Sequence, residues 1–283
     1  MPKDTFFSEK ISICCRGSLL NLDEPLIMGI LNLTPDSFYD GGLHTDSYLL
    51  QVEKMMTEGA SIIDVGGQST RPGAIQLNPD EEKKRILPAI ENIVKRFPEC
   101  ILSVDTFWSD VAESAIESGV AIINDISGGE FDHKMLDVVA KLKVPYIVMH
   151  TQGSPENMQL NPVYTDVVKE VCFSLASKTE KMKLLGINDV LIDPGFGFGK
   201  NIEHNYTLLN YLEHFNLLEK PVLIGVSRKS MINKLLHTQP KNALNGTSII
   251  HTLALIKGAK ILRVHDVKEA VEAIKIVEYM QKN

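Results

Sequence analysis

The sequence is poor in cysteine. Its 283 residues include four cysteines, at positions 14, 15, 100 and 172, and no two of them have C-x-x-C spacing. Because Cys14 and Cys15 are adjacent, the spacing favours neither a disulfide framework nor a zinc site. We therefore expect the four thiols to be reduced and mostly buried.

Long apolar runs and an excess of positive charge are also missing. No run of about 18 apolar residues occurs, and the segment ISICC is too short for a signal-peptide core, so we expect a cytoplasmic protein. The 29 Lys and Arg residues face 36 Asp and Glu, giving a net charge of -7. This balance disfavours broad nucleic-acid or anionic-membrane binding. Any anion site must therefore be local.

What the sequence does contain is a repeated pattern of an apolar run followed by a helical segment. Strands are predicted at residues 26–31, 61–67, 101–106, 121–126, 145–150, 190–195, 221–227 and 259–266. Helices are predicted at 47–58, 80–97, 109–118, 133–142, 162–185, 203–213, 229–236 together with 243–257, and 267–280. The pattern resembles a series of βαβ units, which join parallel strands through helices.

This repeat predicts an α/β fold. Eight parallel strands with connecting helices over about 250 residues are typical of a (β/α)8 TIM barrel, and a doubly wound open sheet is the alternative. With 44% hydrophobic residues the chain can bury one large core, so we expect a single barrel domain over residues 25–283. Residues 1–24 would precede it, with a hairpin at 11–22 that caps one end of the domain.

Polar side chains stand where the predicted strands end. Ligands bind beyond the carboxyl ends of parallel strands in both architectures, so these residues are candidates for a site. They are Asn32, residues 66–71, Asp105, Asn124, His150, Asp193, residues 227–229 and residues 263–266. A single polar residue in such a place is usually a helix N-cap, and Asp266 before Val267 is expected to be one. Eight such ends indicate a binding site.

The candidates divide into two groups by chemistry. One group offers donors for a phosphate or pyrophosphate: Arg71, Arg263 and His265, with the backbone amides of Gly66 and Gly67. The other group offers acceptors and donors suited to the edge of a flat heterocycle. It consists of Asp105, Asn124, Asp193 and Lys229. For Lys229, hydrogen bonding and charge are favoured over a Schiff-base role.

Two other patterns carry less weight. The segment GFGFGK at 195–200 fits neither the P-loop nor the dinucleotide-binding spacing, so its glycines are interpreted as permitting a tight turn. The histidines, His265 aside, are scattered without metal-ligand spacing, and we interpret them as solvated or singly bonded rings.

Eight segments, in order along the chain beyond residue 25, resemble the motifs of dihydropteroate synthases. They are LNLTPDSF (31–38), GGQSTRPGA (66–74), SVDT (103–106), IINDISGG (122–129), MHTQGSPENMQ (149–159), DPGFGFGK (193–200), GVSRK (225–229) and RVHDV (263–267). The resemblance implies a (β/α)8 barrel that condenses 7,8-dihydropterin-6-ylmethyl diphosphate with p-aminobenzoate. The products would be 7,8-dihydropteroate and diphosphate, with Mg2+ as cofactor, in folate biosynthesis.

The resemblance also implies roles for individual residues. Asn32 would contact the metal and the diphosphate, and the phosphates would be bound by Arg71, Arg263 and His265. The pterin ring would be held by Asp105, Asn124, Asp193 and Lys229. The p-aminobenzoate pocket would consist of Phe38, Thr70, Pro72, Phe198 and Ser227. Asp36 would order the first loop, and the catalytic residues would be Asp36, Asp105 and Lys229. A homodimer is implied as well.

Two positions depart from the family pattern. Gln68 stands where the family usually has Glu, and Thr151 where Met is common, which bears on loop geometry. A methyltetrahydrofolate-binding methyltransferase of the same superfamily is the nearest alternative enzyme, but it has no use for a diphosphate clamp. A catalytically idle pterin-binding module is the other alternative, and it would be expected to lack Asp36, Thr70 and Arg71.

Overall fold

A computed structural model describes residues 11–33, 44–68, 76–153 and 162–283 of the chain. Eight parallel strands form one sheet: β3 (Leu26–Asn32), β4 (Ile62–Gly66), β5 (Ile101–Asp105), β6 (Ile122–Asp125), β7 (Tyr146–Met149), β8 (Val190–Asp193), β9 (Leu223–Ile224) and β10 (Ile261–Val264). Strands that follow one another in the sequence are neighbours in the sheet, except β8 and β9, which stand at the two ends of the strand order; β10 pairs with both β9 and β3. A parallel bridge between Ile192 and Val222 joins β8 to the start of β9. The sheet is therefore a nearly closed barrel, which confirms the predicted TIM barrel and excludes the doubly wound order.

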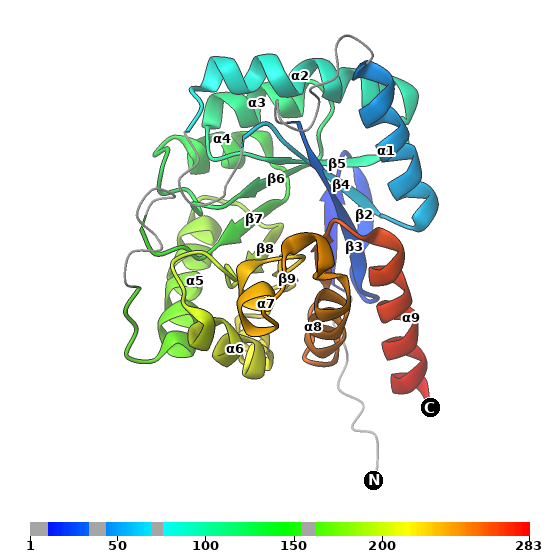
Figure 1. Ribbon diagram of the computed structural model, residues 1–283. Helices are drawn as coiled ribbons and strands as arrows, with labels where there is room; N and C mark the ends of the chain where they lie inside the picture. Colours follow the sequence, from blue (N-terminus) through cyan, green and yellow to red (C-terminus); the bar gives the residue numbers. More distant parts are fainter. Residues whose placement is uncertain (1–10, 34–43, 69–75, 154–161) are drawn as a thin grey trace.

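Helices surround this barrel (Figure 1). They are α1 (His44–Glu58), α2 (Pro79–Arg96), α3 (Ser109–Glu117), α4 (Met135–Leu142), α5 (Val167–Leu184), α6 (Ile202–Asn210), α7 (Ser230–Leu235), α8 (Leu244–Ile256) and α9 (Val267–Lys282). Two 3-10 helices, η2 (Leu212–Leu218) and η3 (Pro240–Asn242), lie between them. Apolar side chains of these helices, such as Val52, Ile90 and Val171, pack in one core cluster with strand residues such as Val65 and Val104, as the helical spacing predicted.

Some boundaries differ from the predicted ones for identifiable reasons. Helix α5 begins at Val167 rather than at residue 162, because the Asp166 side chain accepts a hydrogen bond from the Lys169 amide and caps the helix there. Strand β9 has two residues rather than seven. The 3-10 helix η2 was not predicted.

The amino ends of the strands are closed by an apolar plug. A hairpin of β1 (Ser12–Cys15) and β2 (Ser18–Asn21) packs there, as predicted. Its buried side chains Ile13, Cys15 and Leu22 share one cluster with apolar residues near the starts of the strands, among them Ile62 and Ile261. Apolar packing thus closes this end of the barrel, which serves stability.

The four cysteines are free, as expected, but Cys14 is exposed and Cys172 half-buried, so the prediction of mostly buried thiols holds for two of the four. Burial raises the pKa of the Cys15 and Cys100 thiols to about 12. In the described part of the chain, no helix is long and apolar enough to cross a membrane.

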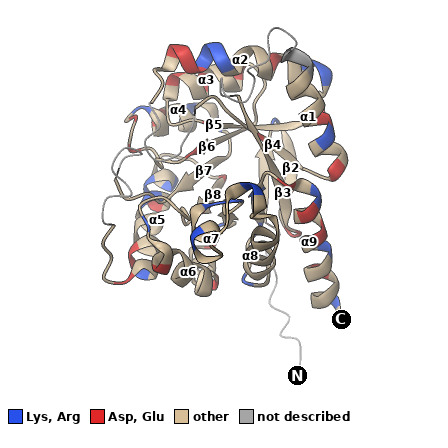
Figure 2. Cartoon of the chain, viewed as in Figure 1, with Lys and Arg blue, Asp and Glu red and all other residues tan. Residues whose placement is uncertain are grey.

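Charged residues of both signs lie over the outer helices (Figure 2). Among the barrel strands that the structure describes, charged residues are confined to five positions, Asp64, Asp105, Asp125, Asp193 and Arg263. Ionised groups inside a barrel need partners or a ligand. These five positions therefore point to the site.

Candidate active site at the barrel mouth

The centre of the mouth is a guanidinium between two carboxylates. The Arg263 side chain donates from Nε to Asp64 at 2.6 Å and from Nη2 to Asp105 at 2.5 Å. Asn124 donates from Nδ2 to the same Asp64 oxygen at 3.0 Å. These contacts join β4, β5, β6 and β10, so four strands that are far apart in sequence fix one polar cluster.

Strand register brings further predicted residues into the same layer. Asn32 is aligned with Gly66, Gly66 with Asp105, and Asp105 with Asn124. Gly66 has no side chain, and a Cβ there would lie 3.8 Å from both the Asn32 and the Asp105 side-chain oxygens. Asn32 is exposed at the end of β3, whereas Asp105 and Asn124 are buried. The register thus predicts, and the structure shows, one polar layer at the carboxyl ends.

Burial sets the electrostatics of this cluster. It raises the pKa of Asp105 to about 6, an effect that Arg263 opposes and Asp64 reinforces. Burial also disfavours the charged guanidinium of Arg263, but Asp64 and Asp105 outweigh this and raise its pKa above the usual range. Arg263 is therefore cationic, with its charge balanced by carboxylates.

A second set of side chains comes from the loops after β8 and β9. Asp193 is buried at the end of β8, and its Oδ1 accepts a hydrogen bond of 2.7 Å from the Gly195 amide. Lys229 donates to the Phe196 carbonyl at 2.6 Å, and its Nζ lies 4.6 Å from the centre of the Phe198 ring. Burial lowers the pKa of Lys229 to about 8, which Asp193 opposes, and burial raises the pKa of Asp193.

Ser227 and His265 form a third contact, between the loop after β9 and the end of β10. The Ser227 hydroxyl lies 3.0 Å from His265 Nδ1 and accepts a hydrogen bond of 3.2 Å from the His265 amide. Ser227 is buried and His265 is exposed. The two residues expected to share a phosphate role, Arg263 and His265, thus face different partners.

Asp266 occupies the N-cap position of α9, as predicted. Its side chain makes no capping hydrogen bond to α9. Instead its two oxygens accept from Arg228 Nε at 2.8 Å and Nη2 at 2.7 Å. Because Arg228 has a φ of +55°, this bidentate pair fixes a left-handed turn directly before Lys229.

Five of the predicted site residues, Asp36, Phe38, Thr70, Arg71 and Pro72, lie outside the described residues. Gln68, at the border of one of these segments, is described. Its amide donates to Glu82 at 3.2 Å and accepts from the Leu77 amide at 3.3 Å. An amide makes both bonds at once, which a carboxylate at this position could not do without a proton.

Sequence reasoning missed Asp64 and Lys200. Asp64 is fully buried, and its Oδ1 accepts no hydrogen bond from the described chain. A signal was present, because an aspartate in the middle of an apolar strand must find a buried partner, and so must an arginine in the middle of another. Lys200 was set aside with the GFGFGK segment, yet it is buried and lies against His150.

Among its described residues the site has no preformed metal cage. In the described segments, no three His, Cys, Asp or Glu residues are grouped so that they could hold a metal ion. The oxygens of Asn32 and Asp105 beside Gly66 are nevertheless of the hard type that Mg2+ prefers.

Comparison with known proteins agrees with this geometry. The model of the family described as "Pterin binding enzyme" matches residues 28–265, which run from β3 to the residue after β10. The dihydropteroate synthase of Escherichia coli (strain K12) is 43% identical over 272 residues, covering 95% of this chain and 96% of that protein.

The chain belongs to the dihydropteroate synthase family of pterin-binding enzymes.

Solved structures of the family are superimposable on nearly the whole chain. The Yersinia pestis dihydropteroate synthase in a sulfonamide drug complex has a TM-score of 0.91 at 42% identity, covering 96% of this chain and 100% of that one. The Xanthomonas albilineans dihydropteroate synthase with 4-aminobenzoic acid has a TM-score of 0.91 at 39% identity, covering 97% and 99%. The dihydropteroate synthase fold thus includes every element that carries the mouth cluster.

Proposed function

We infer that this chain is a transferase of folate biosynthesis that condenses 7,8-dihydropterin-6-ylmethyl diphosphate with p-aminobenzoate, giving 7,8-dihydropteroate and diphosphate. The observation that carries the inference is the convergence of Asp105, Asn124, Asp193 and Lys229 at the mouth of a barrel 43% identical to a dihydropteroate synthase. These groups offer both acceptors and donors in a buried site.

The pterin ring is proposed to lie among these four residues. Asp193 offers carboxylate oxygens to the parallel N–H donors of the ring N3 and the 2-amino group. Its bond to the Gly195 amide and its burial hold that carboxylate in one orientation. Lys229 supplies donors for the remaining edges of the ring. Asn124 supplies an acceptor, because its contact to Asp64 uses the side-chain NH2 group and not the side-chain oxygen.

The reaction forms a C–N bond and breaks the C–O bond to diphosphate at the same methylene carbon. Positive charge develops there and spreads into the dihydropterin as the diphosphate leaves. The buried carboxylates of Asp105 and Asp64 stabilise charge of this sign without having to reorganise. The aromatic amine is neutral at pH 7 and attacks without a strong base; its proton then leaves to water or to the diphosphate.

The diphosphate is proposed to bind beyond the ring, near the ends of β3 and β10. Asn32 and His265 are the exposed described residues there, and Arg71 would join them. The side-chain oxygen of Asn32 is of the kind that Mg2+ prefers, so Asn32 would hold the ion as one oxygen ligand. Bound there, Mg2+ would supply charge neutralisation for the leaving group. Arg263 is placed between the two ends, because its charge is already balanced by Asp64 and Asp105.

The p-aminobenzoate pocket is proposed to include Phe198 and Ser227, with Phe38, Thr70 and Pro72. Lys229 lies over the Phe198 ring, which ties this pocket to the pterin side. Sulfonamides are expected to compete with p-aminobenzoate, and substitutions at Phe38 or Pro72 to weaken that inhibition. Inhibition that is non-competitive toward p-aminobenzoate would contradict this pocket.

A homodimer in the cytoplasm is also proposed. On α8, Ile249, Leu253 and Ile256 are 53%, 43% and 48% exposed, while the opposite face of the helix is buried in the core. An exposed stripe of three large apolar side chains needs a cover, and a second copy of this stripe is a self-complementary one. Free thiols fit a reducing compartment. Residues 25–283 are proposed as the catalytic barrel, with 1–24 as a preceding hairpin segment.

One assay tests the reaction. Purified protein with Mg2+ is expected to release pyrophosphate only when both substrates are present, and chromatography should show 7,8-dihydropteroate in equal amount. Circular dichroism establishes that the preparation is folded. A folded preparation that yields no dihydropteroate would show the proposed function to be wrong.

A further inference from the structure

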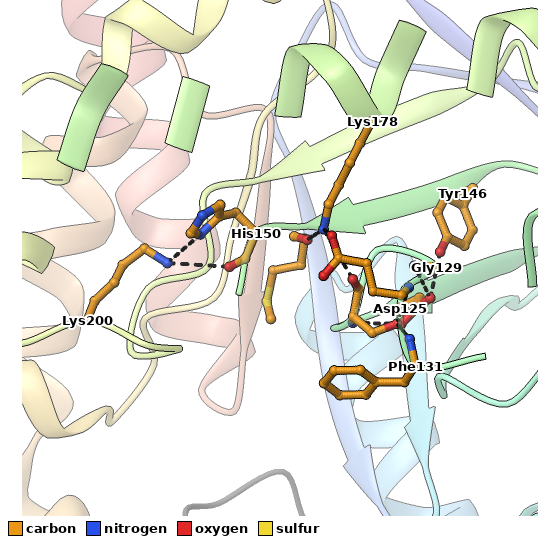
Figure 3. Close-up of polar contacts among 10 residues, drawn as sticks. Asp125, Gly129, Phe131, Tyr146, His150, Lys178 and Lys200 are labelled. Carbon is orange, nitrogen blue, oxygen red and sulfur yellow. Dashed lines mark hydrogen bonds and ion pairs between the residues drawn. The ribbon is translucent and has the colours of Figure 1, made fainter. Parts of the chain in front are cut away.

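Two lysines meet the end of β7 from opposite sides (Figure 3). Lys178, on α5, donates to the carbonyls of Ser127 at 3.2 Å and Met149 at 3.4 Å. Lys200, after the GFGFG turn, donates to the His150 carbonyl at 3.3 Å. Consecutive carbonyls of one strand end therefore each bind an ammonium group.

Lys200 also bonds to the loop after β8. Its Nζ donates to the Gly195 and Phe198 carbonyls, both at 2.9 Å, and lies 3.0 Å from His150 Nδ1. Burial and the lysine lower the pKa of His150 to about 3, so its ring is neutral and Nδ1 can accept. Lys200 is 2% exposed, and burial lowers the pKa of its ammonium group to about 7, an effect that Asp193 opposes, while the carbonyl acceptors favour the charged form.

The loops approach the end of β7 so closely that they require glycine. At Gly195, with a φ of +72°, a Cβ would lie 1.9 Å from the His150 carbonyl oxygen. At Gly128, with a φ of +62°, it would lie 2.7 Å from Lys178 Nζ and 2.9 Å from the Met149 oxygen. The glycines of GFGFGK thus permit a tight turn, as predicted. Gly195 also lets this turn approach the His150 carbonyl, which Lys200 binds.

The loop after β6 is anchored a second time by a buried carboxylate. Asp125 accepts from the Tyr146 hydroxyl at 2.6 Å, from the Ser127 amide at 2.7 Å and from the Gly129 amide at 2.8 Å (Figure 3). Asp125 follows Asn124 directly, so a loop fixed at Ser127 also fixes the strand end that carries Asn124. Lys178 also forms an ion pair of 3.1 Å with Glu130, an exposed carboxylate that contributes little to this anchoring.

We propose that Lys178 and Lys200, which we call the lysine brace, are positioning residues of the active site. They hold the loops after β6 and β8 against the end of β7, so that Asn124, Asp193 and Phe198 stand at fixed separations before substrate binds. The inference rests on the proposed function for the identity of the substrate. The brace touches neither reacting atom; it acts through the backbone that carries the binding groups.

The test replaces the ammonium groups one at a time. Lys200→Met keeps the length of the side chain and removes its donors, and we expect kcat to fall about 100-fold, because small misplacements cost that much. Lys178→Met should cost about tenfold in kcat, since it loses two longer bonds. Affinity for 6-hydroxymethylpterin, measured by calorimetry, should fall with both. KM for p-aminobenzoate should change less than kcat.

Two matched controls isolate the carbonyl bonds. Lys181→Met changes an exposed lysine of the same helix and should leave kcat and affinity unchanged. Glu130→Gln removes the ion pair of Lys178 but keeps the lysine, and should also resemble wild type. Thermal melts show at which temperature each variant is fully folded, and kinetics are compared below it.

The outcomes separate the two inferences. A folded Lys200→Met protein with wild-type kcat and pterin affinity would overturn the brace, even if its melting temperature dropped. If Lys200→Met does not fold, Lys178→Met decides by the same criteria. If the wild type binds 6-hydroxymethylpterin but makes no dihydropteroate, the proposed function is wrong, and the change in pterin affinity alone decides for or against the brace.

Discussion

At the amino ends of the strands the barrel is filled by Ile13, Leu22 and their apolar neighbours, whereas at the carboxyl ends the same strands hold Asp105, Asp193 and Arg263. The apolar residues and the two carboxylates are buried, and Arg263 is half-buried. The difference lies in the effect of burial on free energy. Burial of an apolar side chain stabilises the fold by about 1.5 to 3 kcal/mol, whereas burial of an ionised group costs hydration free energy that partner groups must offset.

This contrast explains why one end of the barrel contributes stability and the other end carries the candidate site. Groups that are expensive to bury can be kept at the mouth because the opposite end supplies apolar contacts. It also makes the comparison testable, because substitutions at the two ends should change different quantities. The expected effects follow from the largest to the smallest.

The largest effect is expected at Arg263. Arg263→Met leaves Asp64 and Asp105 buried without their shared cation, so the free energy of unfolding should fall by about 3–5 kcal/mol. Urea denaturation measures this, and pyrophosphate release should be nearly abolished. Adding Asp64→Asn to Arg263→Met removes one of the two stranded carboxylates and should restore part of the stability. No restoration would mean that the two carboxylates do not depend on Arg263.

At the closed end, Leu22→Ala removes a fully buried side chain from the plug. The free energy of unfolding should fall by about 2–5 kcal/mol, from lost transfer energy and the cavity left behind. Since Leu22 packs in the apolar cluster at the other end of the strands, kcat and both KM values should match wild type below the melting transition. A changed kcat would break the proposed separation of the two ends.

Asp193→Asn is expected to do the reverse. Asn keeps an oxygen for the Gly195 amide, so the melting temperature should change little. Its NH2 group, however, meets an N–H donor of the pterin, and binding of the pterin diphosphate should weaken by about 2–4 kcal/mol. Calorimetric titration measures the loss. Near wild-type affinity would make Asp193 a structural cap of the loop after β8.

Much of this molecule follows from its sequence. The strand repeat predicts the barrel, and polar residues at strand ends predict the layer of Asn32, Asp105 and Asn124, because parallel strands place their carboxyl ends together. The hairpin was readable from two short apolar segments around a turn. Sequence patterns of neighbouring residues are enough to predict these features, because the βαβ repeat determines which strands lie side by side.

The pairings inside the site were not predictable in the same way. Arg263 binds Asp64 and Asp105 across 199 and 158 positions of sequence, and Asp266 prefers Arg228 to its own helix. A side chain's choice between local capping and a distant charge depends on barrel register and burial, which no local pattern encodes. The contacts of Lys200 were unpredictable for a related reason. Its acceptors are backbone carbonyls, which every residue has, so no residue type in the sequence indicates them.

The smallest expected effect is on pH dependence, and it differs between the two ends. Burial raises the pKa of Asp105 from 3.8 to about 6 and lowers that of Lys229 from 10.5 to about 8. Asp105 therefore stabilises the fold fully below pH 3.8, a contribution lost as the pH rises through about 6. The contribution of Lys229 is present above pH 10.5 and lost as the pH falls through about 8.

Between about pH 6 and about pH 8 both groups are thus charged, at a cost to stability, and under the proposed function we expect this form to bind pterin. We expect kcat/KM for the pterin diphosphate to be bell-shaped, falling about tenfold per pH unit outside that window. Asp105→Asn should have low activity without the acid limb, because an amide does not titrate there. Leu22→Ala should keep the wild-type profile at lower stability. An acid limb that survives Asp105→Asn would assign it to another group, and a profile shifted by Leu22→Ala would show that the closed end tunes the mouth.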